Sequence, residues 1–594
     1  MKKLIMGAAV VVFAALAGIL AFGPPVLADS DGTEALNQLF ADDWEFYLEQ
    51  APVFASGFGD LRFNAKLSDP SEKAARSRRD TNKEFLERLS EIDRSALSAD
   101  DQVNYDIFKR LKEDRLREFE FKLYLTPITN RWGFHVAFAQ LPDDVPLQTE
   151  ENYEDYVQRL ELFKEYCEAH IEVMRKGIAE GYVLPKIVME GVEGTIDPHV
   201  VDDATESLLY APFEDYPENI GEAERKKLTE KGRKAIDESV IPGYQMFFDF
   251  MVDEYIPSSR ENIAASALPN GQAYYEYRVR RFTTLDVTPQ EVHDRGLAEV
   301  ARIRTEMQEI IDSVEFEGSF DDFVSFLRTD EQFYAKTPDE LMQYVALALK
   351  KMDGQLPTLF GTLPRMPYGI KPVPDYIAPK TTTAYYNAPS GDGTKAGFYF
   401  VNTYDLKSRP LYEVEALSLH EAVPGHHLQI ALQQELEDMP EFRRFTGFTA
   451  FSEGWALYSE RLGLEAGFYA DPYSDFGRLT YEMWRATRLV VDTGIHYFGW
   501  TRQRAINFMA SNSALTVHNI TTEVDRYISW PGQALAYKTG ELKIRELRSM
   551  AEDELGSEFD VRSFHDVVLG SGAVPLDILE ANVKAWVQSQ KAKS

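Results

Sequence analysis

The residue types that can do chemistry gather in one short segment, residues 417–429, which holds three of the ten histidines of the chain. The residues of this segment that bear on a metal site are His420, Glu421, Pro424, Gly425, His426 and His427. A zinc hydrolase helix carries His-Glu-x-x-His, in which two histidines four residues apart share one helical face and one ion, while the glutamate activates the metal-bound water. Here the fourth position after His420 is Pro424, so the strict motif is absent.

The geometry still permits a metal site. On a regular helix, His420 and His427 would share a face but lie about 10 Å apart along the axis, too far to bind one ion. Pro424 and Gly425 exclude a regular helix, because proline removes a backbone donor and glycine allows unusual dihedral angles. We expect these two residues to form a bulge that brings His426 to the position of the second ligand. His427 would then contact a ligand or the substrate; its assignment as the second ligand stays open.

A third ligand is expected from residues 450–461, which have a helical pattern. Glu453 lies 27 residues after His426, a workable separation for a second helix that crosses the first. Glu460 follows seven residues later, on the same face two turns away. We therefore predict that His420, His426 and Glu453 are the metal ligands and that Glu460 orients a ligand histidine. The alternative is that the histidines cap a helix end at the surface.

Four strings of this sequence resemble a bacterial family, the domain of unknown function 885. They are Leu-Pro-Asn-Gly-Gln-Ala-Tyr-Tyr at 268–275, Leu-His-Glu-Ala-Val-Pro-Gly-His-His-Leu-Gln at 419–429, Ser-Glu-Gly-Trp-Ala-Leu-Tyr-Ser-Glu at 452–460 and Trp-Pro-Gly-Gln-Ala-Leu-Ala-Tyr-Lys-Thr-Gly at 530–540. The family is grouped with the gluzincin type of zinc metallopeptidases. The resemblance extends over most of the chain and implies a mostly helical, zincin-like fold with two lobes around a deep channel. It also implies a glutamate ligand on the next helix, matching Glu453.

The predicted fold class is mainly α, with two helical lobes around a deep cleft and a small β-hairpin or sheet next to the metal-binding helix. We expect a signal peptide or anchor at residues 1–28, a helical N-terminal lobe at 29–280 and a zincin-like catalytic lobe at 281–594. Apolar residues at three- and four-residue spacing predict helices, with hydroxyl caps at Thr288 and Thr337. The predicted helices are 85–97, 103–119, 153–180, 289–314, 338–351 and 411–423.

A β-hairpin is predicted for residues 381–387 and 397–403, which are rich in aromatic and β-branched residues and are separated by turn residues. An extended peptide can pair with the edge of a strand. We therefore expect the strand at 397–403 to bind the substrate backbone and its aromatic residues, Tyr399 among them, to line substrate pockets. The alternative is that these aromatics are ordinary core residues of the hairpin.

A polar stripe lies on the helix predicted around residues 481–500, formed by Arg485, Arg488, Asp492 and His496. Polar groups on an otherwise apolar helix must be paired or face a wet cleft. In the functional interpretation, His496 donates a hydrogen bond to the oxyanion and Arg488 binds a substrate carboxylate. The alternative is a buried Arg–Asp network between helices.

Another helix is predicted to begin at Trp530-Pro531. In this helix Tyr537 could donate its phenol hydrogen to the tetrahedral intermediate, and Lys538 could bind a terminal carboxylate. The alternative is that Tyr537 is a core tyrosine with a satisfied hydroxyl.

The chain is acidic, with a formal net charge of −34 over 594 residues and a pI of about 4.8. Such a surface repels phosphate backbones, so we expect no nucleic-acid partner. Two lysines, an apolar stretch and small residues before Asp29 are typical of a secretory signal, with an uncleaved anchor as the alternative. The protein is thus expected to be exported, periplasmic or otherwise extracytoplasmic. Its single cysteine, Cys167, excludes cysteine-based metal centres.

The predicted activity is zinc-dependent hydrolysis of peptide bonds in short peptides, as in oligopeptidases or carboxypeptidases. Zn²⁺ would be held by two histidines and one glutamate, with Glu421 as the general base. Two alternatives remain from the sequence. One is a zinc amidohydrolase that acts on a non-standard or cell-wall-derived amide. The other is a peptide-binding protein whose catalytic site has decayed.

Overall fold

The computed structural model describes residues 30–593, apart from 376–377, 379–381, 391–392 and 394. The predicted signal peptide or anchor at 1–28 lies outside the described residues. Helices and one three-stranded sheet form the described part, which confirms the mainly α fold class. None of its helices has both the length and the apolar character needed to cross a membrane.

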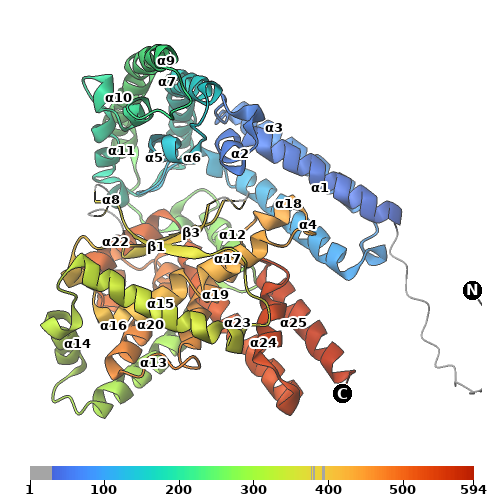
Figure 1. Cartoon of the computed structure of the whole chain (residues 1–594), viewed down its shortest axis with the longest axis vertical. Helices are drawn as coiled ribbons and strands as arrows, with labels where there is room; N and C mark the ends of the chain where they lie inside the picture. The colour runs from blue at the N-terminus through green and yellow to red at the C-terminus, as the bar shows by residue number, and fades with distance from the viewer. Residues whose placement is uncertain (1–29, 376–377, 379–381, 391–392, 394, 594) are drawn as a thin grey trace, which may run out of the picture.

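Helices of the first half of the chain include the long α4 and α7, and Figure 1 shows α5–α11 in the upper part of the molecule. Their bounds are α1 (Ser30–Gln50), α2 (Pro52–Phe58), α3 (Glu72–Ser90), α4 (Ala99–Glu120), α5 (Phe134–Ala139), α6 (Leu141–Asp144), α7 (Glu150–Glu180), α8 (Lys186–Met189), α9 (Glu222–Ala235), α10 (Ile241–Phe250), α11 (Ile256–Ser258) and α12 (Gly271–Thr283).

Helices of the second half include those that pack against the sheet and those that carry the predicted metal ligands. Their bounds are α13 (Pro289–Ser313), α14 (Phe320–Thr329), α15 (Pro338–Leu359), α16 (Leu411–Glu421), α17 (His426–Gln434), α18 (Glu441–Arg444), α19 (Thr449–Leu462), α20 (Pro472–His496), α21 (Arg502–Ala510), α22 (Val517–Ser529), α23 (Ala536–Leu555), α24 (Val561–Leu569) and α25 (Leu576–Lys591).

The long predicted helices are confirmed as α4, α7, α13 and α15, and their caps explain where they begin. Thr288 accepts a hydrogen bond from the backbone of Glu291, whose carboxylate accepts one from the backbone of Thr288, so α13 begins with a capping box. The helix predicted at 85–97 is wrong in its bounds, since α3 ends at Ser90. Asp93 caps a short 3₁₀ turn that follows α3, which starts a new element instead of extending the helix.

The sheet contains β1 (Tyr368–Pro372), β2 (Ala384–Asn387) and β3 (Gly397–Val401) in the order β1-β3-β2. The antiparallel pairing of β2 with β3 confirms the predicted hairpin, of which residue 381 lies outside the described part. Strand β1 pairs with β3 in parallel. Because β3 is the central strand, both of its backbone edges are already paired. The predicted pairing of a substrate peptide with this strand is therefore wrong.

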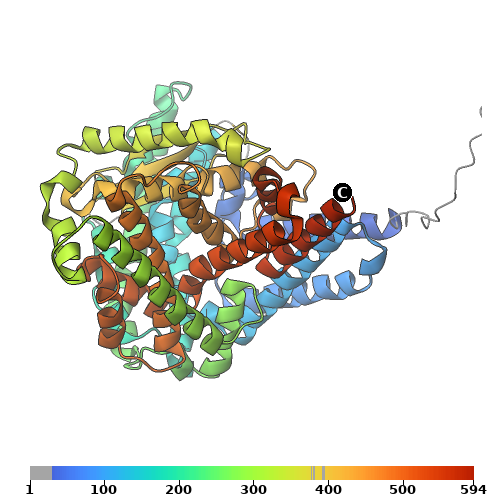
Figure 2. The ribbon, with the colours of Figure 1, turned by 90° about the horizontal axis from the view of Figure 1, so that it is seen from below.

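Two large hydrophobic cores hold the helices together. One joins residues from 128–255 to residues from 300–333 and 476–534. The other joins residues from 36–108 to residues from 335–469 and 536–587. Figure 2 shows the matching arrangement, with the C-terminal helices beside the N-terminal ones. Each core draws on both sides of residue 280, so that position does not separate two hydrophobic cores; the proposed lobes stay a prediction.

Helix α19 crosses α23 at two glycines, which lets the two backbones approach closely. A Cβ added to Gly454 would lie 2.5 Å from Cα of Gly540, and one added to Gly540 would lie 1.9 Å from the carbonyl oxygen of Ala450. Any larger side chain would therefore force the helices apart. Since Glu453 precedes Gly454, this crossing fixes the position of one predicted metal ligand.

Candidate metal centre

The chain breaks its helix between the two histidines of the predicted site. Helix α16 ends at Glu421, and α17 begins at His426. Gly425 is required at the break, because an added Cβ would lie 1.9 Å from the carbonyl oxygen of His420. The sequence predicted a bulge within one helix. The structure instead has two helices joined by a tight connection, with the same effect of bringing His426 back towards His420.

The three predicted ligands lie together. Nε2 of His420 is 3.5 Å from Oε2 of Glu453, and Nε2 of His426 is 3.6 Å from the same oxygen. One ligand atom of each residue falls within 4.8 Å of the other two. Donors bound about 2 Å from one ion in a tetrahedral site lie about 3.3 Å apart. The three side chains therefore fit a shared cation with small adjustments.

His427 does not belong to this group. It is buried, its Nε2 lies 3.0 Å from the carbonyl oxygen of Met366, and its Nδ1 lies 2.7 Å from the hydroxyl of Tyr386. Because a carbonyl only accepts, Nε2 carries the hydrogen and Nδ1 accepts from Tyr386. Burial lowers the pKa of His427 to about 4, so the ring is neutral. Both nitrogens are occupied, so the assignment of His427 as the second ligand is wrong; it attaches α17 to β2.

Glu460 lies where the sequence placed it, next to a ligand. Nδ1 of His420 donates to Oε1 of Glu460 at 2.7 Å, and both side chains are buried. Burial alone would lower the pKa of His420, but the carboxylates of Glu453 and Glu460 outweigh it and raise that pKa to about 10. The two histidines in turn hold the pKa of Glu453 well below its ordinary value despite its burial. The site is thus electrostatically suited to positive charge.

Glu421, the predicted general base, follows His420 directly at the end of α16. Its side chain is half-buried, and no described residue forms a hydrogen bond or ion pair with its carboxylate. A carboxylate without a partner beside a metal site is free to accept a proton.

Tyr399, near Glu421, is fully buried, and burial together with the charge of Glu421 raises the pKa of its phenol. The prediction that Tyr399 lines a substrate pocket is therefore corrected.

His496 is a structural residue. Its Nδ1 accepts from the backbone N–H of Ala265 at 2.9 Å, and its Nε2 donates to the carbonyl of Tyr527 at 2.9 Å. The ring is buried, and burial lowers its pKa to about 3. With both nitrogens bound to backbone groups, His496 has no hydrogen to give to an oxyanion. The predicted catalytic role is therefore wrong.

The two predicted carboxylate-binding cations are also paired inside the protein. Arg488 is buried. It donates hydrogen bonds to the carboxylate of Glu523 at 3.0 Å and to the hydroxyl of Tyr527 at 3.0 Å. Lys538 is fully buried among three carboxylates, those of Glu482 at 2.7 Å, Glu541 at 2.8 Å and Glu299 at 3.2 Å. Both cations are buried and already have carboxylate partners, although Nη1 of Arg488 has no partner among the described residues, so both assignments are corrected. For Arg488 the buried-network alternative applies, with Glu523 as partner instead of Asp492.

Tyr537 remains a candidate. It lies at the start of α23, one turn before Gly540, which packs against Gly454 beside Glu453. Its hydroxyl accepts a hydrogen bond from Arg526 at 3.3 Å, and the guanidinium of Arg488 lies 4.3 Å from its ring centre. Because the hydroxyl accepts here, it keeps its own hydrogen for donation. Its role beside the metal stays a prediction.

Sequence reasoning missed the residues that hold the break between α16 and α17. Nε1 of Trp455 donates to the carbonyl oxygen of Pro424 at 2.8 Å, so α19 supports the connection as well as supplying Glu453. Tyr386 supports it from the sheet through His427. The one available signal was the position of Trp455, two residues after a predicted ligand.

The fold and site together define a mainly helical protein with a His-His-Glu cluster at a broken helix. The family model described as "bacterial protein of unknown function (DUF885)" matches residues 52–583, and the chain belongs to this family. No curated protein matches the chain.

Among solved structures, a candidate lipoprotein from Colwellia psychrerythraea is similar, with 28% identity and a TM-score of 0.88 over 94% of this chain and 99% of that one. A candidate lipoprotein of unknown function from Shewanella oneidensis shares the fold, with 18% identity and a TM-score of 0.68 over 92% and 98% of the two chains.

Proposed function

We propose that this protein is a zinc-dependent peptidase that hydrolyses short peptides. The observation that carries the proposal is the convergence of His420, His426 and Glu453 beside Glu421, whose carboxylate has no partner among the described residues. Two imidazoles and one carboxylate suit Zn²⁺, and three protein ligands leave one position open. When bound, zinc would lower the pKa of a water molecule and polarise the scissile carbonyl.

The chain's own residues would supply the proton transfers. Glu421 would take a proton from the attacking water and pass it to the leaving amine, because its carboxylate has no other partner among the described residues. Glu460 would keep the ring of His420 oriented, with Nε2 towards Glu453. Tyr537 would donate its hydroxyl hydrogen to the negative charge that develops on the carbonyl oxygen.

We also propose that the protein acts outside the cytoplasm. The similar solved structures are candidate lipoproteins, and residues 1–28 have the pattern of a secretory signal. The description of those structures as lipoproteins is not carried over to this chain, because the one cysteine of the printed sequence, Cys167, is buried in α7. Export of this chain would therefore rely on the apolar N-terminal segment itself.

The test combines metal content with cleavage of a peptide library. Wild type and Glu421→Gln should each bind about one zinc ion per chain, whereas His420→Ala should lose it. Glu421→Gln should lower kcat by about 10²–10⁴-fold, because it removes the general base and leaves the ligands. Glu437→Gln, at an exposed position, is the matched control and should keep full activity. Undiminished hydrolysis in Glu421→Gln would exclude the proposed mechanism.

A further inference from the structure

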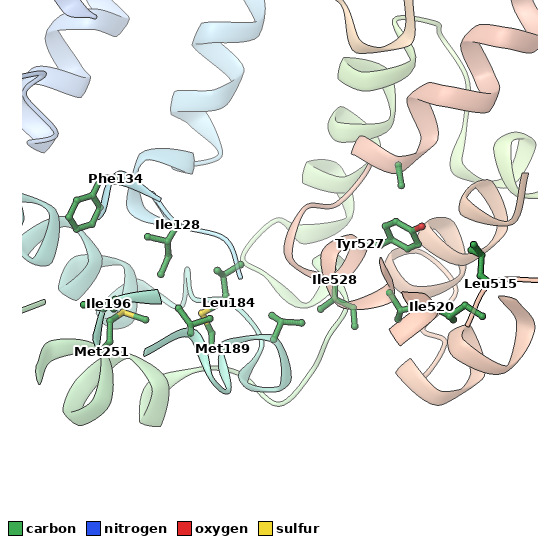
Figure 3. Packing of buried hydrophobic residues seen from close by; sticks show 14 of the residues in the cluster. Ile128, Phe134, Leu184, Met189, Ile196, Met251, Leu515, Ile520, Tyr527 and Ile528 are labelled. Atoms are coloured by element: carbon green, nitrogen blue, oxygen red, sulfur yellow. The ribbon is translucent and has the colours of Figure 1, made fainter. Parts of the chain in front are cut away.

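A cavity of about 190 Å³ lies between the N-terminal part of the chain and the loop that follows α22. Its walls include Leu268, Pro269 and Tyr274 from one sequence string and Trp530 and Pro531 from another, none of which belongs to the metal centre. Figure 3 shows two apolar wall residues, with Leu184 on one side and Ile528 on the other. These wall residues have no role in the proposed hydrolysis, for which the second string supplies only Tyr537, so the cavity needs its own explanation.

Two arginines that have no acidic partner in the described part of the chain line this cavity. Arg278 is buried and donates through Nε to the carbonyl of Pro531 at 3.0 Å. Arg260 donates through Nε to the carbonyl of Val183 at 3.0 Å and through Nη1 to that of Ala264 at 2.8 Å. Among the described residues, no carboxylate forms an ion pair with either guanidinium, and both Nη atoms of Arg278 make no hydrogen bond.

Other buried arginines such as Arg159 and Arg443 also lack an ion pair, but they donate to several protein oxygens, whereas both Nη atoms of Arg278 have no hydrogen-bond partner among the described residues. The chain has 97 acidic and 63 basic residues, so acidic partners are abundant, and other buried cations such as Lys538 have several. A buried charge without a counter-charge is costly. One buried guanidinium, that of Arg278, and one half-buried guanidinium, that of Arg260, in the wall of one cavity indicate a site whose counter-charge arrives with a ligand.

The two loops that form the cavity walls are fixed from behind by α20. Asp492 accepts the backbone N–H of Gly532 with both oxygens at 3.1 Å and the hydroxyl of Tyr275 at 2.6 Å. His496 binds the N–H of Ala265, at the start of the other loop, and the carbonyl of Tyr527. These buried bonds hold both walls in place before a ligand binds, which lowers the cost of binding.

The remaining walls are apolar or aromatic and limit the size of the ligand. Leu184, Leu268 and Ile528 are aliphatic, and Tyr274 and Trp530 add aromatic surface. Sites for drug-sized ligands have volumes of about 300–1,000 Å³. This smaller space suits a group of amino-acid size with one anionic end and an apolar body.

We propose that this cavity binds the carboxylate of a small acid with an apolar or aromatic body. That chemistry is shared by the C-terminal residue of a peptide and by a free N-acylated amino acid. Arg278, with Arg260 beside it, would bind the carboxylate, and the aromatic walls would contact the side chain. The proposal does not depend on the metal centre or on hydrolysis.

The test is isothermal titration calorimetry on the purified protein, with N-acetyl-L-phenylalanine, its amide and the tripeptide Ala-Ala-Phe as probes. The acid should bind at least tenfold more tightly than the amide, because a charge-assisted hydrogen bond to the guanidinium is lost in the amide. Arg278→Gln should weaken binding of the acid at least tenfold. Arg280→Gln makes the same charge change at an exposed position on the same helix and should leave the affinity within twofold. Binding of the tripeptide would show that the cavity takes the carboxylate at the end of a peptide. Binding of the N-acetyl acid alone would show that it takes a free acid.

Two further measurements keep the result unambiguous. Leu268→Trp should abolish binding by filling the cavity while both arginines remain, which covers the case that Arg278→Gln misfolds. Binding should also persist in the presence of EDTA, since a carboxylate could otherwise coordinate a metal. Equal affinity for acid and amide, unchanged binding in Arg278→Gln, loss of binding with EDTA, or no binding at about 10 mM acid would each overturn the proposal.

Discussion

Nδ1 of His420 donates a hydrogen bond to Oε1 of Glu460 at 2.7 Å, inside the protein and away from solvent. This bond fixes which ring nitrogen faces Glu453, because Nδ1 keeps its hydrogen for Glu460 and Nε2 is the nitrogen that can give up its hydrogen and bind a cation. The two residues are 40 positions apart in the sequence and come from α16 and α19. The orientation of one ligand is thus set by the helix that carries another.

Glu460→Gln is expected to weaken zinc binding by about 10–100-fold. The amide can still accept from Nδ1, but it lacks the charge that strengthens the bond and raises the basicity of the ring. Competition with a chromophoric zinc chelator measures the change. Glu437→Gln makes the same chemical change at an exposed site and should bind zinc like wild type. Equal affinities in the two variants would show that Glu460 has no part in metal binding.

The elements and residues that the sequence predicted correctly depend on local spacing. Helices α7 and α13 have long periodic patterns and side-chain caps. Glu453 and Glu460 share one face of α19 simply because they are seven residues apart. Strand β1 was missed since it contains Gly369 and ends at Pro372, residues that are unfavourable in strands. Without β1, the central position of β3 could not be foreseen.

The residues assigned wrongly have partners that are distant in the sequence. His496 binds the backbone of Ala265, 231 positions away. Lys538 binds Glu482, 56 positions away. A polar residue on a buried helix must be paired, but its sequence does not tell whether the partner is protein or substrate. This ambiguity did not affect the three predicted metal ligands, because their spacing in the sequence identified them as a group.

Gly540→Ala is expected to destabilise the protein and weaken zinc binding. The new Cβ would lie 1.9 Å from the carbonyl oxygen of Ala450, so α23 must move away from α19 and Glu453 must shift. Overpacking of this kind costs about 1–3 kcal/mol. Thermal unfolding and zinc competition measure the two effects.

Gly354→Ala is the matched control for that change. Gly354 lies on the exposed face of α15, and an added Cβ would meet no atom within 4 Å. Alanine stabilises a helix by about 1 kcal/mol relative to glycine, so the thermal unfolding midpoint should stay unchanged or rise. A normal midpoint and normal zinc affinity in Gly540→Ala would contradict the close helix crossing.

Gly425→Ala should lower zinc affinity at least tenfold even where the protein remains folded. The added Cβ would lie 1.9 Å from the carbonyl oxygen of His420 and 2.5 Å from that of Leu419, so the connection between the two histidine ligands must open. A ligand displaced by about 1 Å binds poorly to an ion with bonds near 2 Å. Gly447→Ala, with no atom within 4 Å of its added Cβ, should bind zinc normally. Unaltered zinc binding in Gly425→Ala would mean that His426 does not depend on this turn.

Stability should fall as the pH is lowered from about 6.5 towards 3, because several buried histidines are neutral in the folded protein. Burial lowers the pKa to about 3 for His135, His170, His496 and His565. The unfolded chain takes up these protons below a pKa of 6.5, while the folded protein does so only near 3. Each of these histidines therefore makes its full contribution to the free energy of unfolding above pH 6.5. At pH 5 that contribution has fallen by about 2 kcal/mol for each histidine.

His565→Gln isolates one part of this pH effect. Nδ1 of His565 donates to the carbonyl of Leu359 at 2.8 Å, and Nε2 accepts from the hydroxyl of Tyr458 at 2.9 Å. Glutamine cannot take up the proton, so the loss of stability between pH 7 and pH 5 should be about 2 kcal/mol smaller than in wild type, even if the variant is less stable at both pH values. His518→Gln, at an exposed position, should keep the wild-type pH dependence. Thermal unfolding midpoints of the three proteins across this range measure the difference, and parallel curves for all three would show that His565 is protonated equally in the folded and unfolded states.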